Sequence, residues 1–411
     1  MEINQSSLKK NCGICGSADF IPVLNLGEMP VSNAFLKKTD LASPEPIFPL
    51  AVQICQRCKS LQLLHIVSSE LIFKNYNYMT GASKPLVDHF HRLALEIADE
   101  HISSPKNLVV EIGSNDGSLL AKIKDRAKIL GVDPADNIAE IARQSGVPTV
   151  VGFFNTDLAR KIKSEHGEAK VVVANNVMAH IDGIRDVFSG VRDLLSSDGK
   201  FIFEVHWVGN LLTDGGFDQI YHEHFYYHSL SSLKHLVDSL DMVMLDVKLV
   251  PIHGQSMRVY VGKSGVVSES VVEFLERENR MGLTDVKTYK NFSNKVESNK
   301  TKLKELLINL KKAGNKIIGY GAPAKGNTLL NYFNIGPDIV DYIIDTTLSK
   351  QGCFTPGTHI PIVSPEILKK QKPDYAILLS WNYVDSILEK EKELREDGLK
   401  FIIPVPQVRI L

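Results

Sequence analysis

The stretch "NLVVEIGSNDGSLL", residues 107–120, joins an apolar run to a turn rich in glycine and polar side chains. A continuous Leu/Val/Ile run of this length is typical of a strand that is buried in a parallel sheet. The turn that follows carries Gly113 and Gly117, and its end leads into a helical stretch. A strand, a glycine-rich turn and a helix in this order predict a Rossmann-like nucleotide-binding unit.

The turn itself indicates which cofactor it binds. It departs from the dinucleotide fingerprint G-x-G-x-x-G, because Asn115 stands where the second glycine would allow a pyrophosphate to approach. Asp116 also lies where an anion would sit, so a cationic ligand such as S-adenosylmethionine suits the turn better. Asp133 ends the next apolar run, about twenty residues on, where an acidic side chain can accept both ribose hydroxyls.

These features predict a class I methyltransferase, with another Rossmann-type binder as the alternative. The expected cofactor-binding residues are Glu111, Gly113, Ser114, Asn115, Asp116, Gly117, Asp133, Pro134, Asn175 and Asn176.

The alternation of apolar runs and helical stretches continues beyond Asp133. Residues 169–181, 191–207 and 256–263 each contain an apolar run typical of a strand in the same sheet. A charged helical stretch then precedes "NKIIGYGAPAKGNTLLNYF", residues 315–333, which is a second strand, glycine-rich turn and helix. We therefore expect an α/β protein with a methyltransferase domain at residues 76–300 and a second Rossmann-like domain at residues 301–411.

Four of the five cysteines form two C-x-x-C pairs, Cys12 with Cys15 and Cys55 with Cys58. In a cytosolic chain this pattern favours zinc over disulfides. The two pairs can converge into a closed tetrahedral site that leaves no position for water or substrate. We expect a structural zinc ion that stabilises a small β-rich domain at residues 1–75, with unliganded thiols as the alternative.

Composition excludes several classes of protein. The 411-residue chain is 44% hydrophobic and 23% charged, and its 47 basic and 48 acidic residues leave a net charge of -1. This balance argues against nucleic acid as the main partner. The first residues lack the apolar region of a signal peptide, and no apolar run reaches the length of about 18 residues that a membrane span needs. We expect a cytoplasmic enzyme, not associated with membranes.

The segment "IYHEHFYYHS", residues 220–229, concentrates histidines and tyrosines. The zinc-protease pattern H-E-x-x-H fails, because Tyr226 stands in place of the second histidine. His224 and His228 are four residues apart and could share a helix face, so a metal pair is one alternative. Acid/base chemistry is the other, and the paired cysteines already account for a metal.

The chain resembles the nucleotide-sugar C-methyltransferases that build branched-chain deoxysugars. The resemblance spans essentially the whole length, and it lies in the paired C-x-x-C motifs and in "VSNAF", "EIGSNDG", "NNVMAHI", "FDQIYHEHFYYHS", "HGQSMR" and "GYGAPAKGNTLLN". One departure is Gln255, which stands where the family commonly has a second glycine after the histidine of "HGQS". The resemblance implies three domains: a zinc-binding domain, a methyltransferase domain and a Rossmann-like domain that binds the sugar nucleotide.

The resemblance also implies the substrate, a dTDP-linked 4-keto-6-deoxy sugar methylated at C3 or sometimes C5; a GDP-linked sugar is the alternative. Methylating carbon beside a ketone requires a base and stabilisation of the enolate. Carried over from the family, His224 is the leading base, and His180 lines the same cleft. Tyr221 acts on the enolate or as an alternate acid/base, and Glu223 binds the sugar or orients its neighbours. An N- or O-methyltransferase would need no such base, and an RNA-modifying or RNA-binding zinc protein is the more distant alternative.

Further residues are expected to hold the sugar nucleotide. Glycines near a helix N-terminus, together with a lysine, suit a diphosphate. The expected substrate-binding residues are Tyr76, Lys84, Gly321, Lys325, Asn327, Asp345, Trp381 and Asn382. Because three domains can enclose a cleft within one chain, we expect a monomer.

Overall fold

A seven-stranded sheet forms the middle part of the chain in this computed structural model, which describes residues 6–73, 79–252 and 255–411. The strand order is β12-β13-β10-β9-β6-β7-β8. Strands β6 to β10 run parallel, whereas β13 is antiparallel to both of its neighbours. The bounds are β6 Leu108–Ile112, β7 Lys128–Asp133, β8 Thr149–Val151, β9 Ala169–Asn175, β10 Leu195–His206, β12 Val243–Val250 and β13 Ser256–Gly262. This order, with one reversed strand near the edge, confirms the predicted class I methyltransferase fold.

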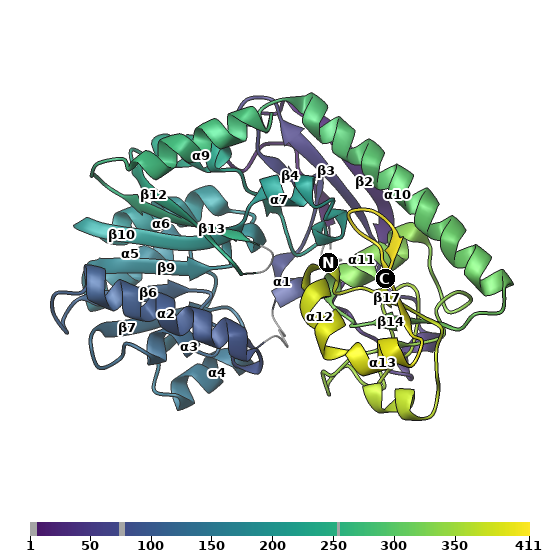
Figure 1. Ribbon diagram of the computed structural model, residues 1–411. Helices are drawn as coiled ribbons and strands as arrows, with labels where there is room; N and C mark the ends of the chain where they lie inside the picture. Colours follow the sequence, from purple (N-terminus) through teal and green to yellow (C-terminus); the bar gives the residue numbers. More distant parts are fainter. Residues whose placement is uncertain (1–5, 74–78, 253–254) are drawn as a thin grey trace.

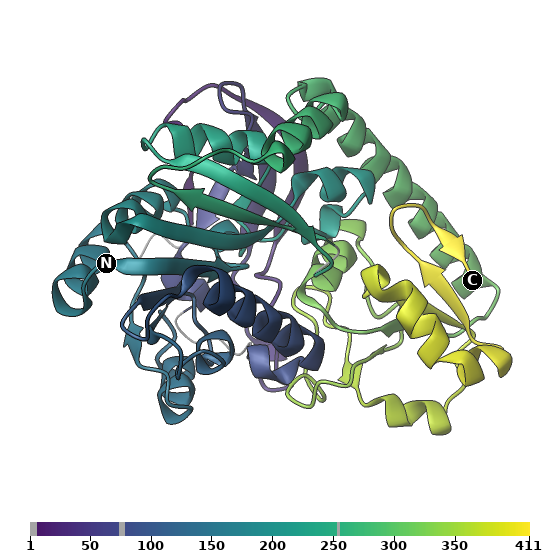
Figure 2. The same ribbon diagram turned by 60° about the vertical axis from the view of Figure 1, so that its left-hand side comes forward.

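The strand order reverses between β6 and β9, so their carboxyl ends form the crevice where open α/β sheets bind ligands. Helices cover both faces of the sheet (Figures 1 and 2). Alternate residues explain this, because Val109 and Val171 pack with α2 on one face and Val110 and Val172 belong to the core on the other. The helices of this part are α2 Lys84–His101, α3 Ser118–Ala121, α4 Asp136–Gln144, α5 Thr156–His166, α6 Ile184–Leu194, α7 Val208–Thr213, α8 Leu230–Asp238 and α9 Glu269–Arg280.

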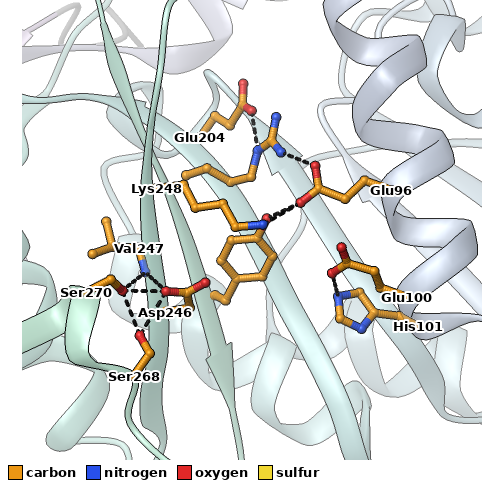
Figure 3. Close-up of polar contacts among 11 residues, drawn as sticks. Glu96, Glu100, His101, Glu204, Asp246, Val247, Lys248, Ser268 and Ser270 are labelled. Carbon is orange, nitrogen blue, oxygen red and sulfur yellow. Dashed lines mark hydrogen bonds and ion pairs between the residues drawn. The ribbon is translucent and has the colours of Figure 1, made fainter.

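A buried charged network fixes α2 to the strands at the edge of the sheet. Arg258 on β13 donates to Glu204 on β10 at 2.8 Å and to Glu96 on α2 at 2.7 Å. Lys248 on β12 donates to the other oxygen of Glu96 at 2.7 Å, as Figure 3 shows. His89 on α2 also lies 2.8 Å from the Glu204 carboxylate. The buried Glu204 carboxylate is thus paired with the buried Arg258, which offsets the cost of removing both from water, whereas Glu96 and Lys248 are partly exposed.

The N-terminal part is a small β structure, as predicted, but it needs a strand from elsewhere in the chain. Its sheet has the order β11-β4-β3-β2, in which β2 is Phe20–Met29, β3 Phe48–Cys55 and β4 Leu61–Leu63. The edge strand β11, Tyr226–Tyr227, comes from the histidine-rich segment. A second, two-stranded sheet pairs β1, Ser6–Leu8, with β5, His65–Val67, and the short helix α1, Ser69–Phe73, follows it.

The C-terminal part is a second doubly wound domain, as predicted. Its sheet has the order β16-β15-β14-β17-β18-β19 and is parallel except at β19. The strands are β14 Ile317–Tyr320, β15 Ile343–Ile344, β16 Ile362–Val363, β17 Tyr375–Leu378, β18 Lys400–Ile403 and β19 Arg409–Ile410. The helices are α11 Ala324–Phe333, α12 Val384–Lys390 and α13 Lys392–Glu396.

The helix α10, Val286–Lys312, joins the two α/β parts and runs beside β2 of the N-terminal sheet (Figure 1). The N-terminal part therefore lies between the other two and contacts both. Across the described ranges, none of the helices combines the length and the apolar character needed to cross a membrane.

Candidate active site

A cavity of about 700 Å³ opens where the carboxyl ends of the central strands face the C-terminal domain. All three parts of the chain line it. The N-terminal part contributes Asn33, the middle part contributes the cofactor turn and the histidine-rich segment, and the C-terminal part contributes Lys325, Lys350 and the residues around Trp381.

The predicted cofactor turn lies at one wall of this cavity. Gly113 has φ +68°, and a Cβ there would lie 2.4 Å from the Cγ2 atom of Val177, so only glycine fits without movement. Asp133, at the end of β7, accepts hydrogen bonds from the backbone N–H groups of Asn115 and Ala135, both at 2.9 Å. The Asp133 carboxylate therefore stabilises the conformation of the turn, and Asp133 also lines the cavity.

Two buried side chains at this wall have polar atoms without a protein partner. Glu111 Oε2 and both amide atoms of Asn175 are buried and unpaired among the described residues. Burial, followed by the nearby charge of Asp116, raises the pKa of Glu111 well above its usual range. Since buried polar groups are normally satisfied, these atoms indicate a polar ligand. The acidic, glycine-containing wall fits S-adenosylmethionine, whose sulfonium and ammonium groups are cationic.

The predicted catalytic pair, Tyr221 and His224, is hydrogen-bonded. The hydroxyl of Tyr221 lies 2.9 Å from His224 Nε2, and His224 Nδ1 donates to the backbone carbonyl of Gln219 at 3.0 Å. The carbonyl can only accept, so this bond assigns the proton to Nδ1 and leaves Nε2 as the basic nitrogen. Both residues line the cavity.

Two further imidazoles surround His224. The ring of His180 lies 4.8 Å from that of His224, and the ring of His206, at the end of β10, lies 5.7 Å from it. His180 Nδ1 donates to the carbonyl of Glu223 at 2.7 Å, and burial lowers the pKa of His180 to about 4. His180 is therefore neutral near pH 7.

Glu223 points toward the N-terminal part. Its carboxylate accepts from the Asn33 amide at 2.7 and 2.9 Å, and burial raises the pKa of Glu223 to about 7. Asn33 belongs to the "VSNAF" segment, whose neighbour Ser32 bonds Thr328 and Asn327 of α11. The three parts of the chain thus meet at this carboxylate.

A partly buried cation faces the cavity from the C-terminal domain. Lys325 Nζ donates to Asn382 Oδ1 at 2.6 Å and lies 3.9 Å from the centre of the Trp381 ring. Trp381 Nε1 donates to the buried Asp218 carboxylate of the middle part at 2.6 Å. Burial, opposed by the charge of Asp218, lowers the pKa of Lys325 to about 8. Lys325, Trp381 and Asn382 come together as one group suited to an anion.

Four more predicted cofactor residues, Ser114, Asn115, Pro134 and Asn176, also line the cavity. The remaining predicted site residues lie outside its lining. Gly117 begins α3 and Asp116 accepts from Gly81 N at 2.6 Å, so both shape the turn from outside the cavity lining. Lys84 is exposed and pairs with Asp88, one turn along α2. Away from the cavity, Asn327 is buried against Ser32, Asp345 accepts from Ala322 N, and Gly321 lies against Ser380. Tyr76 lies outside the described residues.

Comparisons with known proteins match this arrangement. Family models match residues 12–73 ("Putative zinc binding domain"), 82–246 ("Methyltransferase domain") and 251–406 ("C-methyltransferase C-terminal domain"). The chain is also 36% identical over 405 residues to "C-methyltransferase NovU" of Streptomyces niveus, an alignment that covers 97% of this chain and 96% of that protein. The chain belongs to this C-methyltransferase family. It is therefore an S-adenosylmethionine-dependent C-methyltransferase, as predicted.

Solved structures resemble the middle part of this C-methyltransferase only distantly. Magnesium protoporphyrin IX methyltransferase (ChlM) from Synechocystis PCC 6803 has a TM-score of 0.32 and 14% identity, covering 44% of this chain and 79% of that chain. The YcgJ protein of Bacillus subtilis has a TM-score of 0.35 and 13% identity, covering 43% and 100%. Because these TM-scores are low, the fold assignment depends on the sheet topology and the family models.

The zinc-binding domain of this C-methyltransferase has a suitable metal site. The sulfurs of Cys12, Cys15, Cys55 and Cys58 all lie within 4.8 Å of one another. The Sγ atoms of Cys12 and Cys58 lie 3.5 Å apart, and those of Cys15 and Cys55 lie 3.6 Å apart. These distances are near the separation of roughly 3.8 Å that a tetrahedral site with Zn–S bonds of about 2.3 Å requires. Gln62 Nε2 donates to Cys12 Sγ at 3.2 Å, a contact that also suits a thiolate. The cluster fits a closed structural zinc site.

Sequence reasoning missed several residues of this cavity. Asn33 and Lys350 line it, and so does His206, although none of the three was predicted as a site residue. His206 could have been found, because it ends an apolar run whose neighbour in the sheet ends at Asn175. Asn33 lies 190 residues from its partner Glu223, so no local pattern indicates the contact.

Proposed function

We propose that this C-methyltransferase methylates a carbon atom beside the ketone of a nucleotide-linked 4-keto-6-deoxy sugar, at C3 with C5 as the alternative. The observation that carries the proposal is that one cavity holds three kinds of group. These are an acidic cofactor wall at Glu111 and Asp133, a basic imidazole at His224, and a partly buried cation at Lys325. A substrate with an acidic C–H bond at one end and a diphosphate at the other suits this combination.

In the proposed mechanism, His224 Nε2 takes the proton from the carbon next to the ketone. The electron pair of that C–H bond forms the enolate, and the Tyr221 hydroxyl moves from Nε2 to donate to the enolate oxygen. When S-adenosylmethionine is bound, it supplies the electrophilic methyl group that the carbon accepts. His180 is neutral and cannot add a positive charge, so it supports orientation and exclusion of water.

The proposed diphosphate subsite is formed by Lys325 and Asn382, with Lys350 nearby on the cavity wall. Lys350 Nζ donates to the carbonyl of Ala322 at 2.8 Å, which ties it to the turn after β14. A dTDP-linked sugar is the leading substrate and a GDP-linked sugar the alternative. Because all three parts of the chain line the cavity, we expect a monomer, and we place it in the cytoplasm with its thiols reduced.

The test is hydrogen exchange. The enzyme with S-adenosylhomocysteine and a dTDP-linked 4-keto-6-deoxy sugar in D2O should place deuterium at the carbon beside the ketone, measured by ¹H NMR. His224→Asn should abolish this exchange, and His222→Asn is the matched control, because His222 is buried against the Phe48 carbonyl outside the cavity lining. No exchange with the wild type, or full exchange with His224→Asn, would refute the proposed base. Thermal shifts with dTDP-, GDP- and UDP-linked sugars then identify the nucleotide.

A further inference from the structure

The catalytic segment continues directly into the sheet of the zinc-binding domain. Strand β11 begins two residues after His224, and Tyr226 pairs with Gln62 on β4. Phe225 also accepts a backbone hydrogen bond from Leu63 at 3.0 Å. Strand β4 itself begins three residues after Cys58, and Gln62 donates to Cys12 Sγ. The zinc ligands and the proposed base are therefore joined through one pair of strands.

Tyr226 makes the tightest contact in this connection. The residue is 1% exposed, and a Cβ built at Gly13, between the first two zinc ligands, would lie 1.8 Å from its hydroxyl oxygen. The hydroxyl donates to the backbone carbonyl of Asp182 at 2.7 Å and accepts from Lys9 Nζ at 2.9 Å. Lys9 also pairs with the Asp182 carboxylate. The Tyr226 side chain thus lies between the cysteine loop and residue 182.

Asp182 belongs to the other histidine-bearing segment of the site. It follows His180 by two residues and lines the same cavity. The backbone joins the two segments a second time, because Phe225 N donates to the carbonyl of Ala179 at 2.7 Å. Tyr226 therefore holds the segment that carries His224 against the segment that carries His180, and holds both against the zinc loop.

We infer that Tyr226 is a positioning residue. Packed against the zinc-binding cysteine loop, it sets the distance between His224 and His180. The inference rests on the proposed role of His224 as base. It gives the zinc site a function beyond stabilising its own domain, since the cysteine loop at Gly13 lies against Tyr226, and Tyr226 is two residues from His224 in the same segment. A displacement of about 1 Å in a catalytic group can cost roughly a hundredfold in rate.

A buried tyrosine away from the site provides a matched control. Tyr289 is fully buried, and its hydroxyl likewise donates to a backbone carbonyl, that of Leu283 at 2.9 Å, outside the cavity lining. Tyr226→Phe should lower kcat and the rate of deuterium exchange by about ten- to a hundredfold, leaving KM, the affinity for S-adenosylhomocysteine and the zinc content near wild type. Tyr289→Phe should leave all of these within about twofold. Zinc content, measured by metal analysis of the purified protein, separates positioning from loss of the metal.

Two further variants keep the test decisive. If Tyr226→Phe fails to fold, Lys9→Met removes one hydrogen bond to the same hydroxyl and should lower kcat, again with zinc retained. Equal kcat values for Tyr226→Phe and Tyr289→Phe, or a wild-type kcat in Lys9→Met, would overturn the inference. His224→Asn is measured in parallel: if it retains exchange, the proposed base is wrong. If it loses exchange while Tyr226→Phe behaves as wild type, only the positioning role is wrong.

Discussion

The hydroxyl of Tyr221 lies 2.9 Å from Nε2 of His224, on the side of the imidazole opposite the nitrogen that donates to Gln219. One imidazole is thereby oriented at both nitrogens by its own segment. The backbone carbonyl assigns the proton to Nδ1, so Nε2 faces the tyrosine as an acceptor. A base held in this tautomer needs no rearrangement of its own proton before it accepts one from a substrate.

Tyr221→Phe keeps the ring and removes only the hydroxyl. It therefore tests the role of Tyr221 in stabilising the enolate while leaving the proposed base, His224, in place. Loss of one donor to a developing oxyanion typically costs about 100- to 1000-fold in kcat. We expect kcat for methyl transfer to fall by this factor and the affinity for the substrate to fall less. Steady-state kinetics measure both quantities. A kcat within about threefold of wild type would show that Tyr221 merely orients His224.

Glu223 makes the stability of the protein depend on pH. Burial raises its pKa from 4.5 to about 7, so the folded state disfavours the ionised form. Below about pH 4.5 the group is protonated in both the folded and the unfolded chain and the cost is absent; above about pH 7 it is ionised in both and the cost is complete. The cost is about 3–4 kcal/mol.

Glu223→Gln should therefore stabilise the protein relative to wild type, and increasingly so as the pH rises from about 5 to about 8. Thermal unfolding of the two proteins, compared at each pH, measures this difference and cancels contributions that both share, including zinc binding. A difference in Tm that stays constant with pH would contradict the raised pKa. The variant should also lose activity if the carboxylate contacts the sugar.

The lowered pKa of Lys325 predicts a second pH effect, which is a loss of activity at alkaline pH. Burial lowers its pKa from 10.5 to about 8, so the free enzyme loses this cation as the pH passes that value. If Lys325 binds the diphosphate, kcat/KM for the sugar nucleotide should fall above about pH 8, because kcat/KM reports the free enzyme.

Lys325→Met should remove this alkaline limb and raise KM by about 10- to 100-fold, the effect of losing a charged hydrogen bond of roughly 1.5–3 kcal/mol. The matched control is Lys316→Met, since Lys316 lies outside the cavity lining. An alkaline limb that persists in Lys325→Met would assign the titration to another group.

The strongest sequence predictions concerned features that are set by neighbours in the chain. The turn at residues 111–117 and the turn at residues 319–327 each follow an apolar strand, so pattern alone indicates their place in the sheet. The C-x-x-C pairs are equally local, because each supplies two ligands from one turn. These local features are sufficient to predict the fold class and both cofactors.

The contacts between parts of the chain could not be predicted in this way. Strand β11 has only two residues, and it forms because β4 offers an unpaired edge. Lys84 is close in the sequence to residues that line the cavity. Its side chain nevertheless pairs with Asp88, one turn along α2, and is exposed to solvent. Asn327 has a sequence context that suits phosphate, yet its amide meets the carbonyl of Ser32. For β11 and for Asn327 the partner comes from another part of the molecule.

The cofactor turn allows a test with a built-in rescue. Gly113→Ala introduces a Cβ 2.4 Å from Val177 Cγ2 and also forces an L-residue to hold φ +68°. The clash and the backbone strain are separate costs, and the strain alone is about 1–2 kcal/mol. Gly113→Ala should therefore weaken binding of S-adenosylhomocysteine by more than tenfold, as measured by calorimetry. Adding Val177→Ala removes the clash but not the strain, so the double variant should recover part of the affinity. If the double variant binds no better than Gly113→Ala, contact with Val177 is not what requires glycine at this position.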